Sequence, residues 1–124
     1  MTAKVLTVTP ETHVYEAIQI LVTHGVTGIP VIDHEGHVRG IITEQELIHL
    51  LLEELITETQ LVKKFMKTDV ITCSSEDSVI KVCETFLLNP TVNLPVVTEG
   101  KIVGIISRID ILKLISQRKI IKKQ

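Results

Sequence analysis

The sequence predicts a mixed α+β (α/β) fold made of two pseudo-symmetric βαββα repeats. When the 124-residue chain is shifted by 65 residues, Val5 aligns with Val70 and Pro30 with Pro95. Short β-branched runs flank a Gly-bearing turn in both copies, a pattern typical of a hairpin. Aromatic residues make up only 2% of the chain, so its core is built from Ile, Val and Leu. A sheet this small cannot bury itself alone, so we expect the copies to pack as one module.

The helix after each opening strand is predicted from hydrophobic spacing. Apolar residues in the first copy follow the pattern i, i+3, i+4, i+7, i+8: Val14, Ala17, Ile18, Leu21 and Val22. The second copy has the same spacing: Val79, Val82, Cys83, Phe86 and Leu87. This pattern places one stripe of each helix in the core.

Two strands and a turn follow each helix. The first hairpin is predicted from residues 28–32 and 38–43, and the second from residues 93–97 and 102–107. The second turn is one residue shorter, so the offset between the copies falls to 64. Proline cannot donate a hydrogen bond within a sheet. The proline of each first strand is therefore expected at a strand end or an unpaired edge.

A second helix closes each copy, at 44 to about 55 and at 108 to about 120. We expect repeat 1 over 1–56, a linker over 57–67 and repeat 2 over 68–124. The linker carries charges but no Gly or Pro, which favours a continued helix.

Composition argues against several function classes. No apolar run approaches the roughly 18–20 residues that span a bilayer, and no signal peptide is evident. The net charge is −2 with both signs interspersed, so neither nucleic acid nor an anionic membrane is an expected partner. Cys73 and Cys83 are the only cysteines. Two cysteines form no disulfide framework or zinc quartet, which favours a reduced, cytoplasmic compartment.

Neither a metal site nor catalysis is expected. His34 and His37 flank a turn but lack the further ligands of structural zinc. The chain shows no nucleophile with an adjacent base and no phosphate-cradling Gly-rich motif. We therefore predict that the chain is not an enzyme and needs no cofactor.

The junction between the last strand and the last helix carries the most informative motif. It reads Gly-Ile-Ile-Thr-Glu-Gln-Glu over 40–46 and Gly-Ile-Ile-Ser-Arg-Ile-Asp over 104–110. Ser or Thr followed three residues later by a carboxylate is close to a capping box, which satisfies backbone N–H groups at a helix start. A helix N-terminus also binds anions, and a carboxylate can hold a ribose diol. Both interpretations remain open.

The apolar-Pro-apolar-apolar strand, the Gly hairpin and the Gly-x-x-Ser/Thr-x-x-acid junction, present twice, resemble the tandem CBS-domain pair, or Bateman module. The resemblance covers nearly the whole chain. It implies a regulatory module that binds an adenine nucleotide between the repeats and senses it by changing their arrangement. The acid would hold the ribose, Ser or Thr would lie near phosphate, and the base would lie against the other repeat.

Carried onto this sequence, the resemblance implies two clefts. The main cleft would contain Thr2, Leu6, Val26, Thr27, Gly28, Pro30, Ser107, Arg108 and Asp110. The second cleft would contain Thr43, Glu46, Ile71, Thr91 and Val92. In the second cleft Glu46 replaces Asp, and Glu44 stands where the main cleft has Arg108. A carboxylate opposes a phosphate, so we expect the second cleft to bind more weakly.

The expected ligand is AMP, ADP or ATP, and the resemblance implies a disc-like homodimer. Two alternatives stay open. The chain could be a ligand-free structural module that only dimerises, because helix capping alone explains both junction motifs. It could also be the sensor fragment of a larger enzyme, transporter or transcription regulator.

Overall fold

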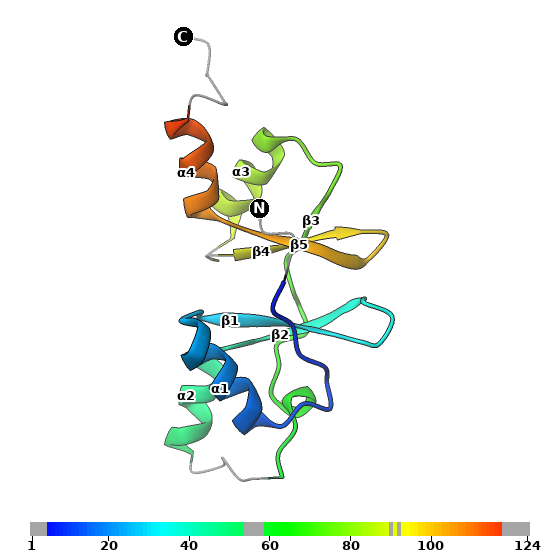
Figure 1. The fold of residues 1–124 in the computed structure, drawn as a ribbon, viewed down its shortest axis with the longest axis vertical. Coiled ribbons are helices and arrows are strands. Elements are labelled where there is room, and N and C mark those ends of the chain that lie inside the picture. Colours follow the sequence, from blue (N-terminus) through cyan, green and yellow to red (C-terminus); the bar gives the residue numbers. More distant parts are fainter. Residues whose placement is uncertain (1–4, 54–58, 90, 92, 118–124) are drawn as a thin grey trace. The chain divides into compact units, whose positions relative to one another are not determined.

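The computed structural model describes residues 5–53, 59–89, 91 and 93–117. The chain divides into two compact units. One unit contains Leu6–Val70, and the other contains Ile71–Gln124 together with Met1–Val5. Helices and short strands alternate in both units (Figure 1), which confirms the predicted α+β class. The predicted boundaries of the repeats and the linker stay a prediction.

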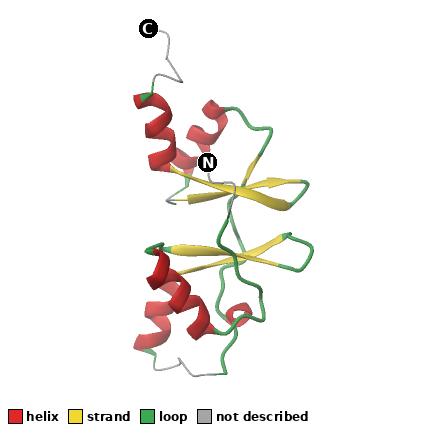
Figure 2. Ribbon diagram, viewed as in Figure 1, coloured by secondary structure: helices red, strands yellow, loops and turns green. Residues whose placement is uncertain are grey.

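The first unit contains α1 (Val14–His24), β1 (Gly28–Ile32), β2 (Val38–Thr43), α2 (Glu44–Leu52) and the 3-10 helix η1 (Val62–Lys64). Strands β1 and β2 form an antiparallel hairpin. Both α-helices lie on one face of that hairpin (Figure 2). The helices therefore bury their apolar stripes against β1 and β2.

The second unit contains β3 (Cys73–Ser74), α3 (Val79–Leu88), β4 (Asn93–Thr98), β5 (Lys101–Ser107) and α4 (Arg108–Ser116). Strand β3 runs parallel to β4, and β4 pairs antiparallel with β5. This unit follows the predicted order of strand, helix, hairpin and helix.

Strand register confirms the repeat residue by residue. Val31 pairs with Gly40 in the first hairpin, and Val96 pairs with Gly104 in the second. The register shifts immediately after each of these pairs, between Val31 and Ile32 and between Val96 and Val97. Both hairpins thus share one β-bulge position, where the extra residue bends the strand.

Each unit has its own aliphatic core. Six residues of the first core are fully buried: Val14, Ala17, Ile29, Val31, Ile42 and Val62. The second core consists of Cys73, Val82, Phe86, Leu94, Val96 and Ile111. The predicted stripes hold for most helix positions, but Val22 is 75% exposed and Leu87 is 87% exposed. These residues lie at one edge of the stripe, beyond the width that so narrow a sheet can cover.

Proline lies inside each first strand of the hairpins and not at a strand end. The expectation of an edge position holds for Pro30, because β1 is an edge strand, and fails for Pro95, because β4 lies between β3 and β5. Pro30 pairs with Ile41 and Pro95 with Ile105. The carbonyl of Pro30 accepts a hydrogen bond from Val8 N–H at 3.1 Å. In a strand, the N and O atoms of one residue point to the same side. The missing donor of Pro30 therefore faces the side of the hairpin on which, among the described residues, Val8 alone forms a bridge.

The described part of the connector is not the continued helix that we expected. Helix α2 ends at Leu52, and residues 59–61 precede the short η1 helix. Val62 N–H donates to Thr12 O at 2.8 Å, and Lys67 exchanges two 2.8 Å backbone hydrogen bonds with Ile41. Burial of Val62 in the first core outweighs helix propensity here. The predicted extension of α4 over 118–120 lies outside the described residues.

Within the described ranges, the structure contains no helix with the length and apolar character needed to cross a membrane.

Candidate ligand-binding site

A reciprocal capping box joins β5 to α4 in the second unit. Ser107 is the N-cap of α4, and its backbone is extended. Asp110 N–H donates to Ser107 Oγ at 3.2 Å, and Ser107 N–H donates to Asp110 Oδ2 at 2.8 Å. The capping interpretation of this motif is therefore confirmed. It places a hydroxyl and a carboxylate side by side at the start of a helix.

The carboxyl group of Asp110 is held in its ionised form. Its partial burial acts to raise its pKa, but the Ser107 N–H, the Ser107 side chain and the Lys113 charge outweigh that effect. The pKa consequently lies below its ordinary value. The capping box uses Oδ2, so Oδ1 can accept a further hydrogen bond from a ligand.

The equivalent junction in the first unit is built differently. Thr43 is the N-cap of α2, but its side chain accepts no capping hydrogen bond. The Thr43 hydroxyl instead donates to Glu46 Oε2. The predicted capping box is therefore wrong at this position, because the longer Glu side chain reaches the hydroxyl itself. Among the described residues, Glu46 Oε1 is buried without a hydrogen-bond partner.

The first unit brings several predicted site residues next to one another. Gly28 pairs with Thr43, and Glu44 N–H donates to Thr27 O at 2.9 Å. Thr27 is exposed and Val26 is half-buried. Leu6 is exposed, whereas Pro30 is buried in the hairpin.

In the second unit, Asn93 pairs with Ser107 at the end of the hairpin. Thr91 lies two residues before it, and its hydroxyl donates to Asn93 O at 2.9 Å. Ile71 is 42% exposed. Thr2 and Val92 lie outside the described residues.

Each predicted cleft combines residues of both units, and the structure describes each unit by itself. The membership of the two clefts therefore stays a prediction. What the structure establishes is the local chemistry of each half: an ionised Asp110 beside Ser107 in one unit, and a Glu46 with a buried, unpaired oxygen in the other.

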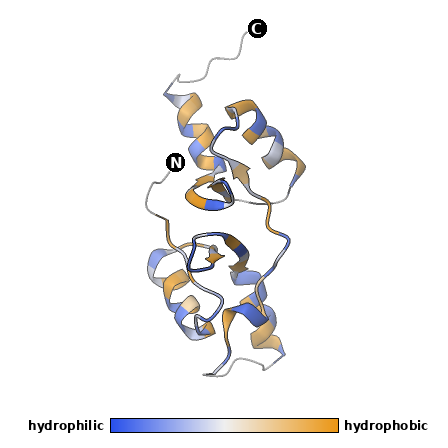
Figure 3. Ribbon diagram, turned by 90° about the vertical axis from the view of Figure 1, so that its right-hand side faces the viewer, coloured by the Kyte–Doolittle hydropathy of each residue, from blue (hydrophilic) through white to orange (hydrophobic). Residues whose placement is uncertain are grey.

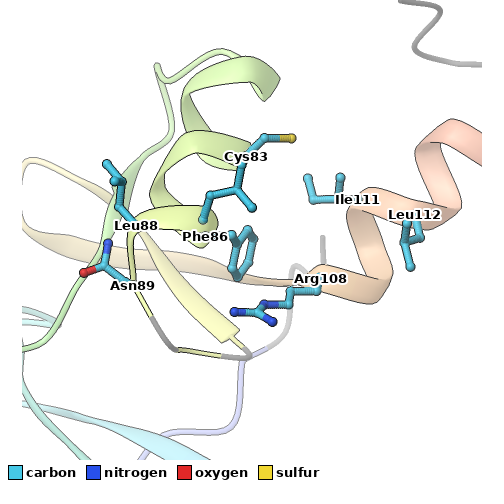
Figure 4. Close-up of a pocket in the computed structure, with 8 residues that line it drawn as sticks. Cys83, Phe86, Leu88, Asn89, Arg108, Ile111 and Leu112 are labelled. Atoms are coloured by element: carbon cyan, nitrogen blue, oxygen red, sulfur yellow. The ribbon is translucent and has the colours of Figure 1, made fainter.

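An apolar groove between α3 and α4 is a feature that our reading of the sequence missed. It has a volume of about 580 Å³. In Figure 4, side chains of the two helices face one another, and Arg108 extends from the start of α4 below the Phe86 ring. We call it the α3/α4 groove, and six of its lining residues are Cys83, Phe86, Leu87, Arg108, Ile111 and Leu112.

A smaller groove of about 390 Å³ lies between α1 and α2 in the first unit. We call it the α1/α2 groove, and six of its lining residues are Ile18, Leu21, Val22, Glu44, Leu47 and Ile48. The hydrophobic spacing of the helices contained a signal for both grooves, because each helix has more apolar residues than a short hairpin can cover. Figure 3 shows hydrophobic residues on the helices of both units.

The described residues give little support for a metal site or a reactive nucleophile. Among them, no three His, Cys, Asp or Glu side chains group in a way that could hold a metal ion. Burial and the Asp77 charge raise the pKa of the Cys73 thiol, so this thiol is a poor nucleophile. In the first hairpin turn, Asp33 Oδ1 accepts hydrogen bonds from the N–H groups of Glu35 and His37. These bonds organise the turn.

Two repeats of a helix, a β-hairpin and a second helix, each with a Ser/Thr-x-x-acid junction at its last helix, define a tandem-repeat module; the predicted opening strand forms as β3 in the second unit and only as an isolated bridge at Val8 in the first. The family model of the CBS domain matches residues 1–53 and residues 62–117. The chain belongs to the CBS-domain family, as the sequence motifs predicted.

Two relatives come from Methanocaldococcus jannaschii. The uncharacterised protein MJ1225 is 33% identical over 115 residues, which cover 93% of this chain and 41% of MJ1225. Inosine-5'-monophosphate dehydrogenase is 36% identical over 111 residues, which cover 88% of this chain and 21% of the enzyme. The chain thus spans less than half the length of either relative.

Solved structures of CBS-domain proteins share the fold. CBSX2 in complex with AMP is 29% identical with a TM-score of 0.81, and the match covers 94% of this chain and 90% of CBSX2. The crystal structure of MJ1225 is 30% identical with a TM-score of 0.82, and the match covers 93% of this chain and 45% of that one.

Proposed function

We propose that this chain is a regulatory module that binds an adenine nucleotide (AMP, ADP or ATP) and reports its presence to another protein or domain. The observation that carries the proposal is the Ser107–Asp110 junction, where an ionised carboxylate and a hydroxyl lie together at a helix start. The similarity to CBSX2, whose structure contains AMP, supports an adenosyl ligand.

The ligand chemistry follows from the groups at this junction. Asp110 accepts hydrogen bonds from the ribose hydroxyls, because its carboxylate is ionised and one oxygen is outside the capping box. The phosphate lies near Ser107 and the first N–H groups of α4, since a helix N-terminus attracts anions. Arg108, which is exposed at the first position of α4, adds a positive charge for phosphate.

The base lies against the other repeat, at residues before its hairpin. Leu6, Val26 and Thr27 supply a partly apolar, accessible surface for an adenine ring. The second cleft, with Thr43 and Glu46, binds more weakly because Glu44 places a negative charge where the main cleft has Arg108. The buried, unpaired Oε1 of Glu46 still favours a ligand that donates a hydrogen bond there.

Sensing follows from a ligand that contacts both repeats. Such a ligand favours the arrangements of the repeats in which both sets of contacts form, and so shifts their population. The shift is limited by the difference in ligand affinity between the arrangements. A neighbouring protein or domain reads that change. The module itself catalyses no reaction, and in an enzyme such as the related dehydrogenase a segment of this kind would be the regulatory part.

Self-association is a further part of the proposal. Large apolar side chains on all four helices are more than half exposed, among them Val22, Ile48, Leu87 and Leu112. Exposed apolar surface of this extent marks an interaction site. We propose that a second copy of the chain covers it in a homodimer.

The alternative is a structural module that dimerises without a ligand. Its support is that the capping box already satisfies the Ser107 and Asp110 groups within the chain. Isothermal titration calorimetry with AMP, adenosine and GMP separates the two. We expect saturable binding of AMP and adenosine, and weaker binding of GMP. No binding of any adenine compound at millimolar concentration would favour the structural module.

Asp77 provides the matched control for this titration. Ser74 N–H donates to Asp77 Oδ2 at 2.9 Å, a local hydrogen bond of the same kind as that of Asp110 and in the same unit. Asp77 belongs to neither proposed cleft. Asp110→Asn should weaken AMP binding, whereas Asp77→Asn should not. Equal effects of both variants would show that binding responds to stability rather than to the site.

A further inference from the structure

Two hydrogen-bond donors at residues 43–46 are already used within the chain. We call these residues the first junction, and the equivalent residues 107–110 the second junction. The Thr43 hydroxyl donates its proton to Glu46 Oε2, and Glu44 N–H donates to Thr27 O at 2.9 Å. A hydroxyl has one proton, so Thr43 Oγ1 can only accept a further hydrogen bond. Because ionised phosphate oxygens are also acceptors, neither the Thr43 hydroxyl nor Glu44 N–H is left to hold a phosphate.

The charges of the two junctions also differ. Glu44 is exposed and Glu46 is half-buried, and in the described part of the chain neither side chain forms a salt bridge. The first junction therefore carries two negative charges. At the second junction, the charges of Arg108 and Asp110 cancel. Carboxylates in the first turn of a helix are favoured by the helix dipole, so the acidic residues alone do not indicate a ligand.

The carboxylate of Glu46 provides an observation that does point to a ligand. Its Oε2 is bonded to Thr43, but among the described residues its Oε1 is buried without a hydrogen-bond partner. An acceptor that is removed from water and unpaired is costly, and such atoms are rare in native proteins. The side chain as a whole is only half-buried, so a donor can approach the carboxylate from its exposed side. A ribose hydroxyl is a donor of this kind.

We propose that the first junction selects a nucleoside with a positively charged, hydrogen-bond-donating 5′ substituent, such as a protonated amine, and rejects a 5′-phosphate. The inference rests on the proposed function and specifies the class of ligand for the second cleft. A ribose hydroxyl donates to Glu46 Oε1, and the 5′ ammonium donates to Thr43 Oγ1 and lies near the Glu44 charge. A phosphate in that position would meet an acceptor and a carboxylate instead. The two junctions thus sort ligands by the charge of the 5′ group.

Calorimetry of the full chain with the Asp110→Asn substitution tests the second cleft, because this change weakens the main one. The probes are AMP, adenosine and 5′-amino-5′-deoxyadenosine, whose amine is protonated near pH 7. The amine should bind most tightly and AMP most weakly, with about a tenfold difference between them at low salt. The difference should shrink at about 1 M salt, because salt screens exposed charges. Equal affinities, or tightest binding of AMP, would overturn the proposed selection.

Two further substitutions in the Asp110→Asn chain separate the roles of the acidic residues. Glu44→Arg gives the first junction the charge of the second and should reverse the order, so that AMP binds more tightly than the amine. The matched control is Glu16→Arg, since Glu16 is exposed in the first turn of α1 and belongs to neither proposed cleft. That control should keep the order of the three ligands. The same shift in both variants would reflect the overall charge of the chain and would overturn a local role for Glu44.

Glu46→Ala in the same chain should weaken all three ligands about tenfold, because each has the ribose hydroxyls. A loss confined to the amine would overturn the assignment of Glu46 to the ribose, provided that circular dichroism shows the variant to be folded. The wild type separates this inference from the proposed function. If the wild type binds AMP through Asp110 while the Asp110→Asn chain binds no amine, the ligand class of the second cleft is wrong and the proposed function stands. If the wild type binds no adenine compound, both are wrong.

Discussion

Replacing Asp110 with Ala should affect both stability and nucleotide binding, by different amounts. In the free protein the substitution removes the 2.8 Å hydrogen bond from Ser107 N–H and leaves the Ser107 hydroxyl as the only side-chain cap of α4. In the complex it also removes the proposed acceptor for the ribose hydroxyls. The two losses can be measured separately because one needs a ligand and the other does not.

The structure indicates how large the loss of stability and the loss of affinity should be. Ser107 and Asp110 are both half-buried, so solvent compensates in part for a lost capping bond, and the cost to stability is about 1 kcal/mol. For a chain of this size that corresponds to a fall in Tm of roughly 4 °C. A lost charge-assisted hydrogen bond to the ligand costs about 1.5–3 kcal/mol, which is roughly ten- to a hundredfold in affinity.

The assay compares three variants by urea unfolding and by calorimetry with AMP. Asp110→Asn keeps an oxygen that can accept from Ser107 N–H but turns an NH₂ donor toward the ligand, so it should recover much of the stability and little of the affinity. Glu46→Ala, in the second cleft, should change AMP affinity little. If Glu46→Ala abolished binding and Asp110→Ala did not, our assignment of the two clefts would be reversed.

Three further outcomes are expected. Gly40→Ala should lower the free energy of unfolding in urea by about 1–3 kcal/mol, because its Cβ would lie 2.6 Å from Lys67 O. Gly25→Asn should cost less, since Gly25 has a left-handed φ of 62° that Asn tolerates and open space around it; similar losses at both positions would refute the steric argument. If Arg108 contacts phosphate, Arg108→Ala should lower the affinity for AMP more than the affinity for adenosine in calorimetry. An equal loss of affinity for both ligands would show that Arg108 does not contact phosphate. Stability should fall as pH drops through the lowered pKa of Asp110, because its ionised form stabilises the fold above the unfolded value of about 3.9. Asp110→Asn should flatten that decline in unfolding curves between about pH 5 and pH 2, and an unchanged decline would contradict the role of its ionised form.

The sequence predicted the repeated architecture because that information is local. Hydrophobic spacing, turn residues and the Ser107–Asp110 motif each depend on neighbours within a few positions. These features need no knowledge of what packs against them.

The failures of sequence-based prediction concern contacts between distant segments. Val62 enters the first core and Lys67 pairs with Ile41, and neither contact is visible in a segment that has good helix propensity and no Gly or Pro. Thr43 and Glu46 fit the capping pattern as well as Ser107 and Asp110 do, yet their hydrogen bonds differ. One additional methylene decides whether the carboxylate accepts a hydrogen bond from the backbone N–H or from the hydroxyl. The spacing of residues in the sequence does not predict that difference.

The two repeats diverge most meaningfully within seven residues, at 40–46 and 104–110. Within this stretch, Glu46 of the first repeat corresponds to Asp110 of the second, so the carboxylate proposed to accept from the ligand differs in length. Glu44 corresponds to Arg108, so the charge beside the helix groove differs in sign. These two positions belong to the first turn of one helix, so the backbone that orients one also orients the other. If Asp110 accepts the ribose hydroxyls and Arg108 contacts the phosphate, the same turn of α4 carries both contacts. A change in the orientation of that turn then alters both contacts together. A duplicated motif that kept both junctions identical would give two equal clefts and two like-charged grooves, and would lose both distinctions together.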